Sequence, residues 1–167
     1  MPFVLLPTWR ADSITDITAD FLKQQDVKLL MLDFDNTIVP YTTDIPTQQV
    51  QLWLSQMVHS GIRVCVVSNS RKERVPVFCK ENGLDCITHA RKPFPDGIRR
   101  CLRQFGVPGD KAVLVGDQIF TDTLGGNFAG VRTVLVKAID NHNIWLKLRH
   151  VAELPFIAVS KNRRIIK

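Results

Sequence analysis

The sequence predicts an α/β protein built on an open, doubly wound parallel sheet. Short apolar runs rich in Val, Ile and Leu alternate with longer stretches of helical period, which is typical of parallel strands covered by helices on both faces. Crossovers between parallel strands are right-handed, and ligands of such sheets bind beyond the carboxyl ends of the strands. The expected strands are residues 29–33, 63–68, 85–88, 112–117 and 133–136.

Helix signals lie between these strands. One helix is expected to open at Pro46 and to end at Gly61, because Pro suits the first turn of a helix and Gly its C-terminal end. Residues 12–25, before the first strand, have an amphipathic pattern and are expected to form a helix over one edge of the sheet. The other expected helices are residues 75–82, 98–105 and 122–129.

Length and composition indicate one folded domain, residues 1–167. The chain has 22 Lys and Arg against 16 Asp and Glu, and 45% of its residues are hydrophobic, which excludes fibrous and disordered proteins. We divide the chain into a motif-bearing core at about residues 28–136, an N-terminal helical extension, 1–27, and a basic C-terminal segment, 137–167. No apolar run approaches the roughly 18 residues of a membrane-spanning helix, and the start lacks the pattern of a signal peptide, so a cytoplasmic protein is expected.

Net positive charge is confined to the C-terminal end of the chain. Residues 1–130 hold 14 basic and 14 acidic side chains, whereas residues 131–167 hold eight basic and two acidic ones. This pattern excludes a generally basic nucleic-acid coat, so no nucleic acid partner is expected, and it indicates one local basic surface. No Cys-x-x-Cys pair is present, and the cysteines are expected to be reduced thiols in the core: Cys65, Cys79, Cys86 and Cys101.

Polar side chains gather where the expected strands end. Because side chains alternate along a strand, Asp33 and Asp35 point to the same side, and Asp117 arrives from a neighbouring strand. The repulsion among three carboxylates has to be neutralised, and Mg²⁺, which binds carboxylate, water and phosphate oxygens, can do this. Other polar residues at these ends are Ser68, Asn69, Lys92 and Asp122.

Each of these residues, taken alone, is common in turns, in helix caps or among solvated charges. Their combination is informative, because acids, a hydroxyl, an amine and another acid appear in that order. Each lies at the carboxyl end of a different strand or in the loop just after it. Together, these residue types make a phosphate-binding site.

Four segments of the chain resemble motifs I to IV of the haloacid dehalogenase (HAD) superfamily. They are Asp33-Phe34-Asp35-Asn36-Thr37, Ser68-Asn69-Ser70, Lys92-Pro93 and the stretch GDQIFTD at residues 116–122. The strings LDFDNTIV, VVSNS, RKP and VGDQIFTDTLGGNFAGV are most similar to subfamily IIIA phosphatases of the YqeG type. Some relatives in that branch are phosphatidylglycerophosphate phosphatases of cardiolipin synthesis.

The resemblance implies a Rossmann-like core and a phosphatase that works through an aspartyl-phosphate. Asp33 would be the nucleophile, and Asp35 would protonate the leaving oxygen and then activate the hydrolytic water. Ser68 and Lys92 would bind the oxygens of the transferred phosphoryl group, with backbone amides near Asn69 helping.

The same resemblance implies the metal and its ligands. Mg²⁺ would be held by the Asp33 and Asp117 carboxylates, by the Asp35 backbone carbonyl and, through water, by Asp122. The charge of the metal would let two anions, the carboxylate and the phosphate, approach each other.

The spacing of the motifs leaves no room for the cap domain that many HAD proteins place over small substrates. There are 32 residues between Asp35 and Ser68 and 23 between Ser68 and Lys92, so one helix and one strand use up each interval. An uncapped site favours a phosphorylated substrate that itself fills the mouth of the site, such as a lipid headgroup or a macromolecule.

The C-terminal residues 144–167 mix apolar side chains with six of the eight basic residues found after residue 130. We expect this segment either to dock on an anionic membrane surface, which would make the protein peripheral, or to pack on its own domain. Phosphatidylglycerophosphate is one expected substrate, and phosphoproteins and nucleotides are alternatives. A response-regulator-like switch is disfavoured by the order of the acids, and a non-catalytic phospho-binding or scaffold protein is a further alternative.

Overall fold

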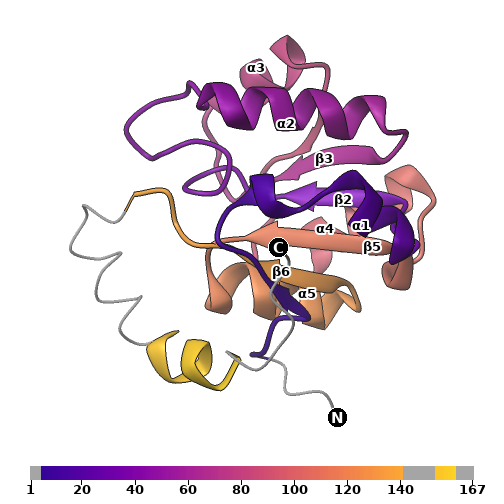
Figure 1. Cartoon of the computed structure of the whole chain (residues 1–167), viewed down its shortest axis with the longest axis vertical. Helices are drawn as coiled ribbons and strands as arrows, with labels where there is room; N and C mark the ends of the chain where they lie inside the picture. The colour runs from indigo at the N-terminus through magenta and orange to yellow at the C-terminus, as the bar shows by residue number, and fades with distance from the viewer. Residues whose placement is uncertain (1–4, 141–152, 161–167) are drawn as a thin grey trace.

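The computed structural model describes residues 5–140 and 153–160, and a six-stranded sheet with the order β1-β6-β5-β2-β3-β4 runs through it (Figure 1). All of its strand pairings are parallel. This confirms the predicted sheet, and each of the five expected strands is present. The strands are β1 Trp9–Arg10, β2 Leu29–Leu32, β3 Arg63–Val67, β4 Asp85–Ile87, β5 Ala112–Gly116 and β6 Arg132–Leu135.

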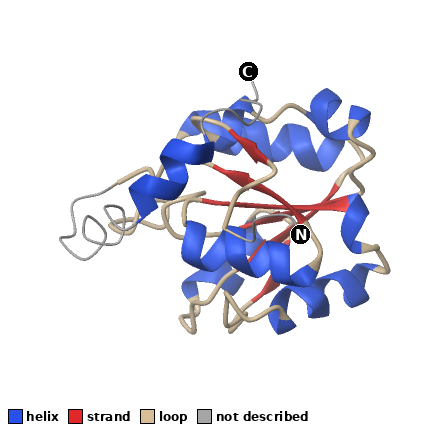
Figure 2. Ribbon diagram, turned by 90° about the horizontal axis from the view of Figure 1, so that it is seen from below, coloured by secondary structure: helices blue, strands red, loops and turns tan. Residues whose placement is uncertain are grey.

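Helices cover both faces of the sheet, as the doubly wound class requires (Figure 2). Alternate residues of β2 point to the two faces of the sheet. Leu30 and Leu32 belong to the hydrophobic core between the sheet and helices α1, α2 and α3. Leu29 and Met31 belong to the core between the sheet and α4. Short α5 contacts α4 and β6. The helices are α1 Ala19–Gln24, α2 Gln48–His59, α3 Arg74–Glu81, α4 Asp96–Phe105 and α5 Leu124–Ala129.

The prediction of one helix over residues 12–25 is wrong. A 3₁₀ turn at Ile14–Asp16 comes first, and α1 begins only at Ala19. Each piece has its own cap: the Ser13 hydroxyl accepts from the Thr15 amide at 3.2 Å, and the Thr18 hydroxyl accepts from the Phe21 amide at 3.1 Å. Two N-caps five residues apart favour two short elements over one continuous helix.

The first strand, β1, was not predicted. It is two residues long and pairs with β6 at the edge of the sheet, Trp9 beside Val134 and Arg10 beside Leu135. The Trp9 ring packs edge-on against Phe21 of α1, with ring centroids 5.3 Å apart. So short a strand shows no alternation in the sequence, and its position depends on these tertiary contacts.

The helix expected over residues 122–129 is shorter than predicted. Its regular part, α5, begins at Leu124, and Ile119–Thr123 before it form a π-helix. Wide turns of this kind are rare and often occur at functional sites. Here the π-helix directly follows the Gly116-Asp117 segment at the end of β5.

The connections between the motif strands are short. A loop and α2 join β2 to β3, and α3 alone separates β3 from β4, so the described segment 29–87 contains no cap domain. The four cysteines are free thiols, as predicted; Cys65, Cys79 and Cys101 are buried and Cys86 is half-buried.

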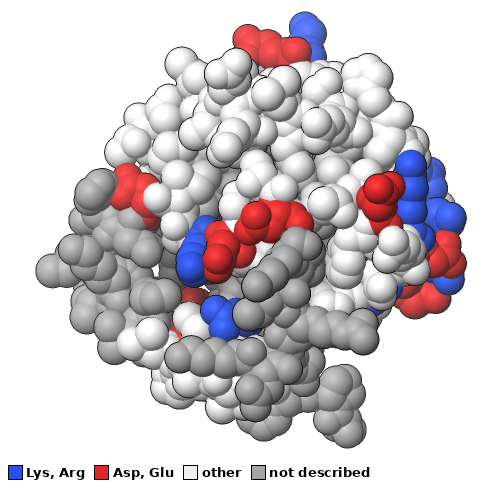
Figure 3. Space-filling model, in the orientation of Figure 1, with Lys and Arg blue, Asp and Glu red and all other residues white. Residues whose placement is uncertain are grey.

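Residues 153–159 form a further helix, at the yellow end of the chain in Figure 1. On the face shown in Figure 3, basic side chains lie beside acidic ones. Ion pairs among the described residues include Lys28 with Asp26 and Lys137 with Asp12, both at 2.9 Å. In the described part of the chain, no helix has the length and apolarity that crossing a membrane requires.

Candidate active site

The predicted nucleophile, Asp33, directly follows β2 in the middle of the sheet. Its backbone amide donates to the Val115 carbonyl at 2.9 Å, so the pairing of β2 with β5 continues up to the aspartate. The next residue, Phe34, is fully buried and packs edge-on against Phe78, with ring centroids 5.2 Å apart. Asp33 and Asp35, on either side of this anchor, line one cavity, as the alternation along the strand predicts.

Lys92 joins two of the predicted site carboxylates. Its Nζ lies 2.6 Å from Asp33 Oδ1 and 2.7 Å from Asp122 Oδ1, and its side chain is almost completely buried. Burial by itself would lower the pKa of Lys92, but the charges of Asp122 and Asp33 outweigh it and raise the pKa above its ordinary value. Lys92 is therefore a fixed positive charge inside the site.

Asn69 holds the backbone of the lysine loop in place. Its Nδ2 donates to the Lys92 carbonyl at 2.9 Å, and its Oδ1 accepts from the Lys92 amide at 2.7 Å. The preceding residue, Ser68, is buried and accepts a hydrogen bond from the Ser70 amide at 3.0 Å. All three predicted phosphate ligands, Ser68, Asn69 and Lys92, line the same cavity, and the Asn69 side chain orients Lys92 in addition.

Three carboxylates meet beside the lysine. Asp33, Asp117 and Asp122 each place an oxygen within 4.8 Å of the others. The Asp122 carboxylate lies against Gly116, where a Cβ would come within 2.3 Å of it, and it also accepts from the Gln118 amide at 3.2 Å. Only glycine at position 116 leaves this space open.

The charge balance and the donor set of this cluster fit a hard divalent cation. Burial raises the pKa of Asp33 to about 7, since Lys92 opposes the effect only partly and Asp122 adds to it. Carboxylate oxygens in such an environment are the ligands that Mg²⁺ takes, and a second positive charge would favour their ionised form. Among the predicted ligands, the structure brings the side chains of Asp33, Asp117 and Asp122 together.

The Asp35 carboxylate lies outside this cluster and is held by Arg74, the first residue of α3. Arg74 Nη2 donates to Asp35 Oδ1 at 2.8 Å, Arg74 Nε lies 3.0 Å from Asp44 Oδ1, and the guanidinium carbon stands 5.1 Å from the centre of the Phe34 ring. Partial burial raises the pKa of Asp35 above its ordinary value, although Arg74 opposes this shift. A carboxyl group with a raised pKa beside the nucleophile suits a general acid.

The cavity at this edge of the sheet has a volume of about 240 Å³. All seven predicted site residues border it or belong to the acidic cluster beside it. Sequence reasoning did not predict Tyr41, which is 43% exposed and stands at the cavity. The residues lining it are Asp33, Asp35, Tyr41, Ser68, Asn69, Ser70, Lys92, Gln118 and Thr121.

The sequence analysis also predicted no role for Glu153 or Arg74. Glu153 is buried, and its Oε1 accepts from the backbone amides of Ile119 and Phe120 at 3.1 and 3.4 Å. The ring of Phe156, from the same helix, packs edge-on against Phe120, with centroids 5.9 Å apart. Residues 153–160 therefore pack on the domain, which is one of the two alternatives that the sequence left open for the C-terminal segment.

Comparison with known proteins agrees with this geometry. The family model described as HAD-hydrolase-like matches residues 89–143. The protein named "Probable phosphatase YqeG" of Bacillus subtilis is 37% identical over 131 residues, which are 78% of this chain and 76% of that protein. The chain belongs to the HAD-like hydrolases. Within them it falls with the YqeG-type phosphatases, as its motifs predicted.

Two further proteins resemble this HAD-like hydrolase more distantly. The chloroplastic/mitochondrial phosphatidylglycerophosphate phosphatase 1 of Arabidopsis thaliana is 27% identical over 171 residues, covering 96% of this chain and 46% of that protein. The cobalt-bound deoxy-D-mannose-octulosonate 8-phosphate phosphatase of Haemophilus influenzae superimposes with a TM-score of 0.55 at 12% identity, over 84% of this chain and 93% of that one. This second likeness supports the fold.

Proposed function

We propose that this protein is a Mg²⁺-dependent phosphomonoesterase that works through an aspartyl-phosphate on Asp33. The observation that carries the proposal is the contact of Lys92 Nζ with both Asp33 and Asp122, inside a cluster that also contains Asp117. Such a site can offset the charge of a phosphoryl group while a carboxylate attacks it. Mg²⁺, held by Asp33, Asp117 and Asp122, would supply charge that lets two anions meet.

In the first half-reaction, an Asp33 carboxylate oxygen forms a bond to phosphorus as the bond to the ester oxygen breaks. Asp35 gives its proton to that leaving oxygen, and the raised pKa of Asp35 favours the protonated form that this step needs. In the second half-reaction, Asp35 takes a proton from water as the water oxygen attacks phosphorus. The bond between phosphorus and the Asp33 oxygen breaks, so inorganic phosphate leaves and the Asp33 carboxylate is restored.

Phosphatidylglycerophosphate is our proposed substrate. The Arabidopsis relative carries this activity in its name, and the described segment around the site has no cap, so a headgroup at a lipid surface could reach it. Phosphoproteins and nucleotides are the competing substrates. A non-catalytic scaffold is disfavoured because every side chain that the chemistry requires lies at one edge of the sheet.

The test is phosphate release, with Mg²⁺ and with a chelator, from phosphatidylglycerophosphate in anionic vesicles, a phosphopeptide, a nucleoside monophosphate and an aryl phosphate. The Asp33→Asn variant should lose all turnover. Asp85→Asn changes the exposed first residue of β4, which does not line the site cavity, and is the matched control. Turnover of the lipid above all others supports the proposed substrate, and no Mg²⁺-dependent turnover of any substrate contradicts the enzyme.

We also propose that the basic C-terminal segment contacts an anionic membrane. Its six basic residues after position 140, together with most of its apolar ones, lie outside the described residues, so the support comes from the sequence alone. Binding to anionic vesicles should fall when residues 161–167 are removed, because each near-surface Lys or Arg contributes about 1 kcal/mol. Equal binding by the full and shortened chains would contradict this part of the proposal.

A further inference from the structure

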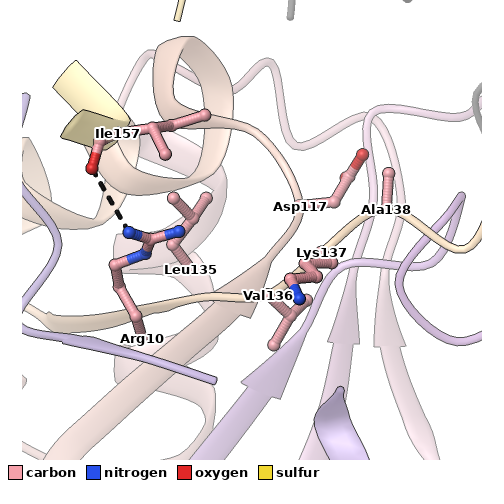
Figure 4. Close-up of a pocket in the computed structure, with 7 residues that line it drawn as sticks. All are labelled: Arg10, Asp117, Leu135, Val136, Lys137, Ala138 and Ile157. Carbon is pink, nitrogen blue, oxygen red and sulfur yellow. Dashed lines mark hydrogen bonds between the residues drawn. The ribbon is translucent and has the colours of Figure 1, made fainter. Parts of the chain in front are cut away.

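A second pocket, of about 340 Å³, has Asp117 of the acidic cluster in its wall. Figure 4 shows Arg10 and Ile157 on one side of it and Asp117 on the other. Asp117 belongs to the acidic cluster that also contains Asp33, so the pocket borders the place where the phosphoryl group would react. The remaining lining residues are Leu135, Val136, Lys137 and Ala138.

The pocket combines two cations with apolar walls. Arg10 ends β1 and Lys137 follows β6, so the edge pairing of these two strands brings both cations to one place. The apolar part of the lining comes from Leu135 at the end of β6, from Val136 and Ala138 after it, and from Ile157 of the C-terminal helix. A ligand that joins an anionic group to a hydrocarbon portion would match such a lining.

Arg10 is well placed to bind an anion. Its Nη1 donates to the Ile157 carbonyl at 3.2 Å, which fixes the guanidinium at the pocket, and it forms no ion pair with a carboxylate of residues 5–140 or 153–160. A guanidinium has five N–H donors in a planar fork that matches phosphate oxygens, so one bond to a carbonyl leaves several donors for a ligand.

Lys137 can add a second positive charge. Its ion pair with Asp12 measures 2.9 Å, but both side chains are about two-thirds exposed, at 67% and 72%. Exposed ion pairs of this kind contribute little to stability. The Lys137 ammonium can therefore turn to a ligand in the pocket at small cost.

From this placement we infer that the pocket bounded by Arg10 and Lys137 binds a second anionic group of the substrate, a phosphate on the leaving group of the phosphomonoester. The inference rests on the proposed phosphatase activity and deepens it, because it names what distinguishes the substrate. The reacting phosphate lies at Asp33 and the second phosphate lies beyond Asp117. A lipid headgroup and a soluble bisphosphate share this chemistry.

The test compares substrates with and without a second phosphate, and the soluble pair differs in that phosphate alone. The soluble pair is propane-1,3-diol bisphosphate and 3-hydroxypropyl phosphate. The lipid pair is phosphatidylglycerophosphate and a long-chain alkyl phosphate, both in neutral detergent micelles. The measured quantity is the ratio of kcat/KM between the two members of each pair. Arg10→Gln and Lys137→Gln are the test variants.

The chain offers a matched control for each variant. Arg63 Nη1 also donates to a backbone carbonyl, that of Phe105 at 2.7 Å, but Arg63 begins β3, which lies three strands away from β6 in the sheet. Lys28 is also an exposed lysine paired with an aspartate, Asp26 at 2.9 Å, before β2. Arg63→Gln and Lys28→Gln remove the same charges away from the pocket, so both should keep the wild-type ratio.

We expect the wild type to prefer the member with two phosphates. Arg10→Gln should lower that ratio by about tenfold, mainly through KM, which is the effect of losing one charge-assisted hydrogen bond. A ratio lowered for the lipid pair alone assigns the second anion to a headgroup, and one lowered for the soluble pair alone assigns it to a small bisphosphate. Lys137→Gln should lower the same ratio, and it keeps the test decisive if Arg10→Gln unfolds.

Two results would overturn the inference in different ways. If the wild type hydrolyses both members of each pair without preference, or if Arg10→Gln and Lys137→Gln keep the wild-type ratio, the subsite is absent and the phosphatase proposal stands. If the wild type hydrolyses no member of either pair with Mg²⁺, and no other phosphomonoester, the phosphatase proposal itself fails.

Discussion

Glu153 accepts a hydrogen bond from the backbone amide of Ile119 at 3.1 Å, across 34 residues of sequence. The same oxygen lies 3.4 Å from the Phe120 amide, so one buried carboxylate serves two successive donors. These amides open the π-helix that carries Asp122, and the first N–H groups of a helix have no partner within it. Glu153 is therefore a positioning residue for residues 117–122, a loop that runs into the π-helix and holds two of the proposed metal ligands, Asp117 and Asp122.

Glu153→Ala should loosen that loop. Removing the carboxylate leaves the backbone amides of Ile119 and Phe120 without their hydrogen-bond acceptor. The loss lowers the free energy of unfolding by about 1–3 kcal/mol for each amide that stays buried. We expect a lower Tm and a higher Mg²⁺ concentration at half-maximal activity. Glu153→Gln keeps a carbonyl oxygen as acceptor and should restore much of the Mg²⁺ response. If Glu153→Ala lowers Tm but leaves the Mg²⁺ response unchanged, its role is only structural.

Gly116→Ala should disturb the acidic cluster while the sheet remains folded. The new Cβ would lie 2.3 Å from the Asp122 carboxyl group, so the aspartate has to move away from Asp33 and Asp117. Gly61→Ala is the control. No atom lies within 4 Å of the Cβ that this substitution adds, but Gly61 has a φ of +83°. The substitution therefore costs only backbone strain, of about 1–2 kcal/mol. Both variants should lower Tm, but only Gly116→Ala should weaken Mg²⁺ binding, as measured by calorimetry.

Addition of Mg²⁺ should stabilise the folded protein. A ligand at 100 times its Kd stabilises the native state by about 2.7 kcal/mol, and a domain of this size gains roughly 2–4 °C in Tm per kcal/mol. A thermal melt with Mg²⁺ should therefore lie several degrees above one with a chelator. Asp117→Asn should remove most of this difference, and an equal rise in wild type and variant would place the metal elsewhere.

Asp26→Asn should reveal a pH-dependent contribution to stability far from the site. Hydrogen bonds from Lys111 and Lys28 lower the pKa of Asp26 from 3.8 to about 2. Because the folded-state pKa is the lower one, the stabilisation is complete above pH 3.8 and disappears as the pH falls through 2. Asp26 has a φ of 53°, which Asn tolerates, so the substitution removes the charge without adding strain.

The measurement is Tm as a function of pH. Near pH 6 the variant should have a lower Tm than the wild type, and the Tm curves of the two proteins should converge near pH 2. Concentrated salt should narrow the gap at pH 6, because these side chains are exposed and salt screens them. Curves that stay equally far apart at every pH would show that the carboxylate charge is not responsible.

Most of the reacting groups could be predicted from the sequence, because they depend on local rules. Asp33 and Asp35 follow a buried strand at a spacing of two, and Ser68, Lys92 and Asp117 follow the ends of other strands. Parallel strands bring their carboxyl ends to one edge, so strand positions alone place these residues together. The ordered motifs also identified the family that the comparison with YqeG shows.

The groups that hold and surround this chemistry were decided by the tertiary structure. The contacts of Glu153 with Ile119, of Arg74 with Asp35 and of Arg10 with Ile157 join residues 34, 39 and 147 positions apart. No periodicity or spacing encodes such contacts, because they arise only when packed helices and a two-residue edge strand bring distant segments together. Thus the sequence by itself determined the fold class and the reacting residues, and packing decided how they are held and what lies beside them.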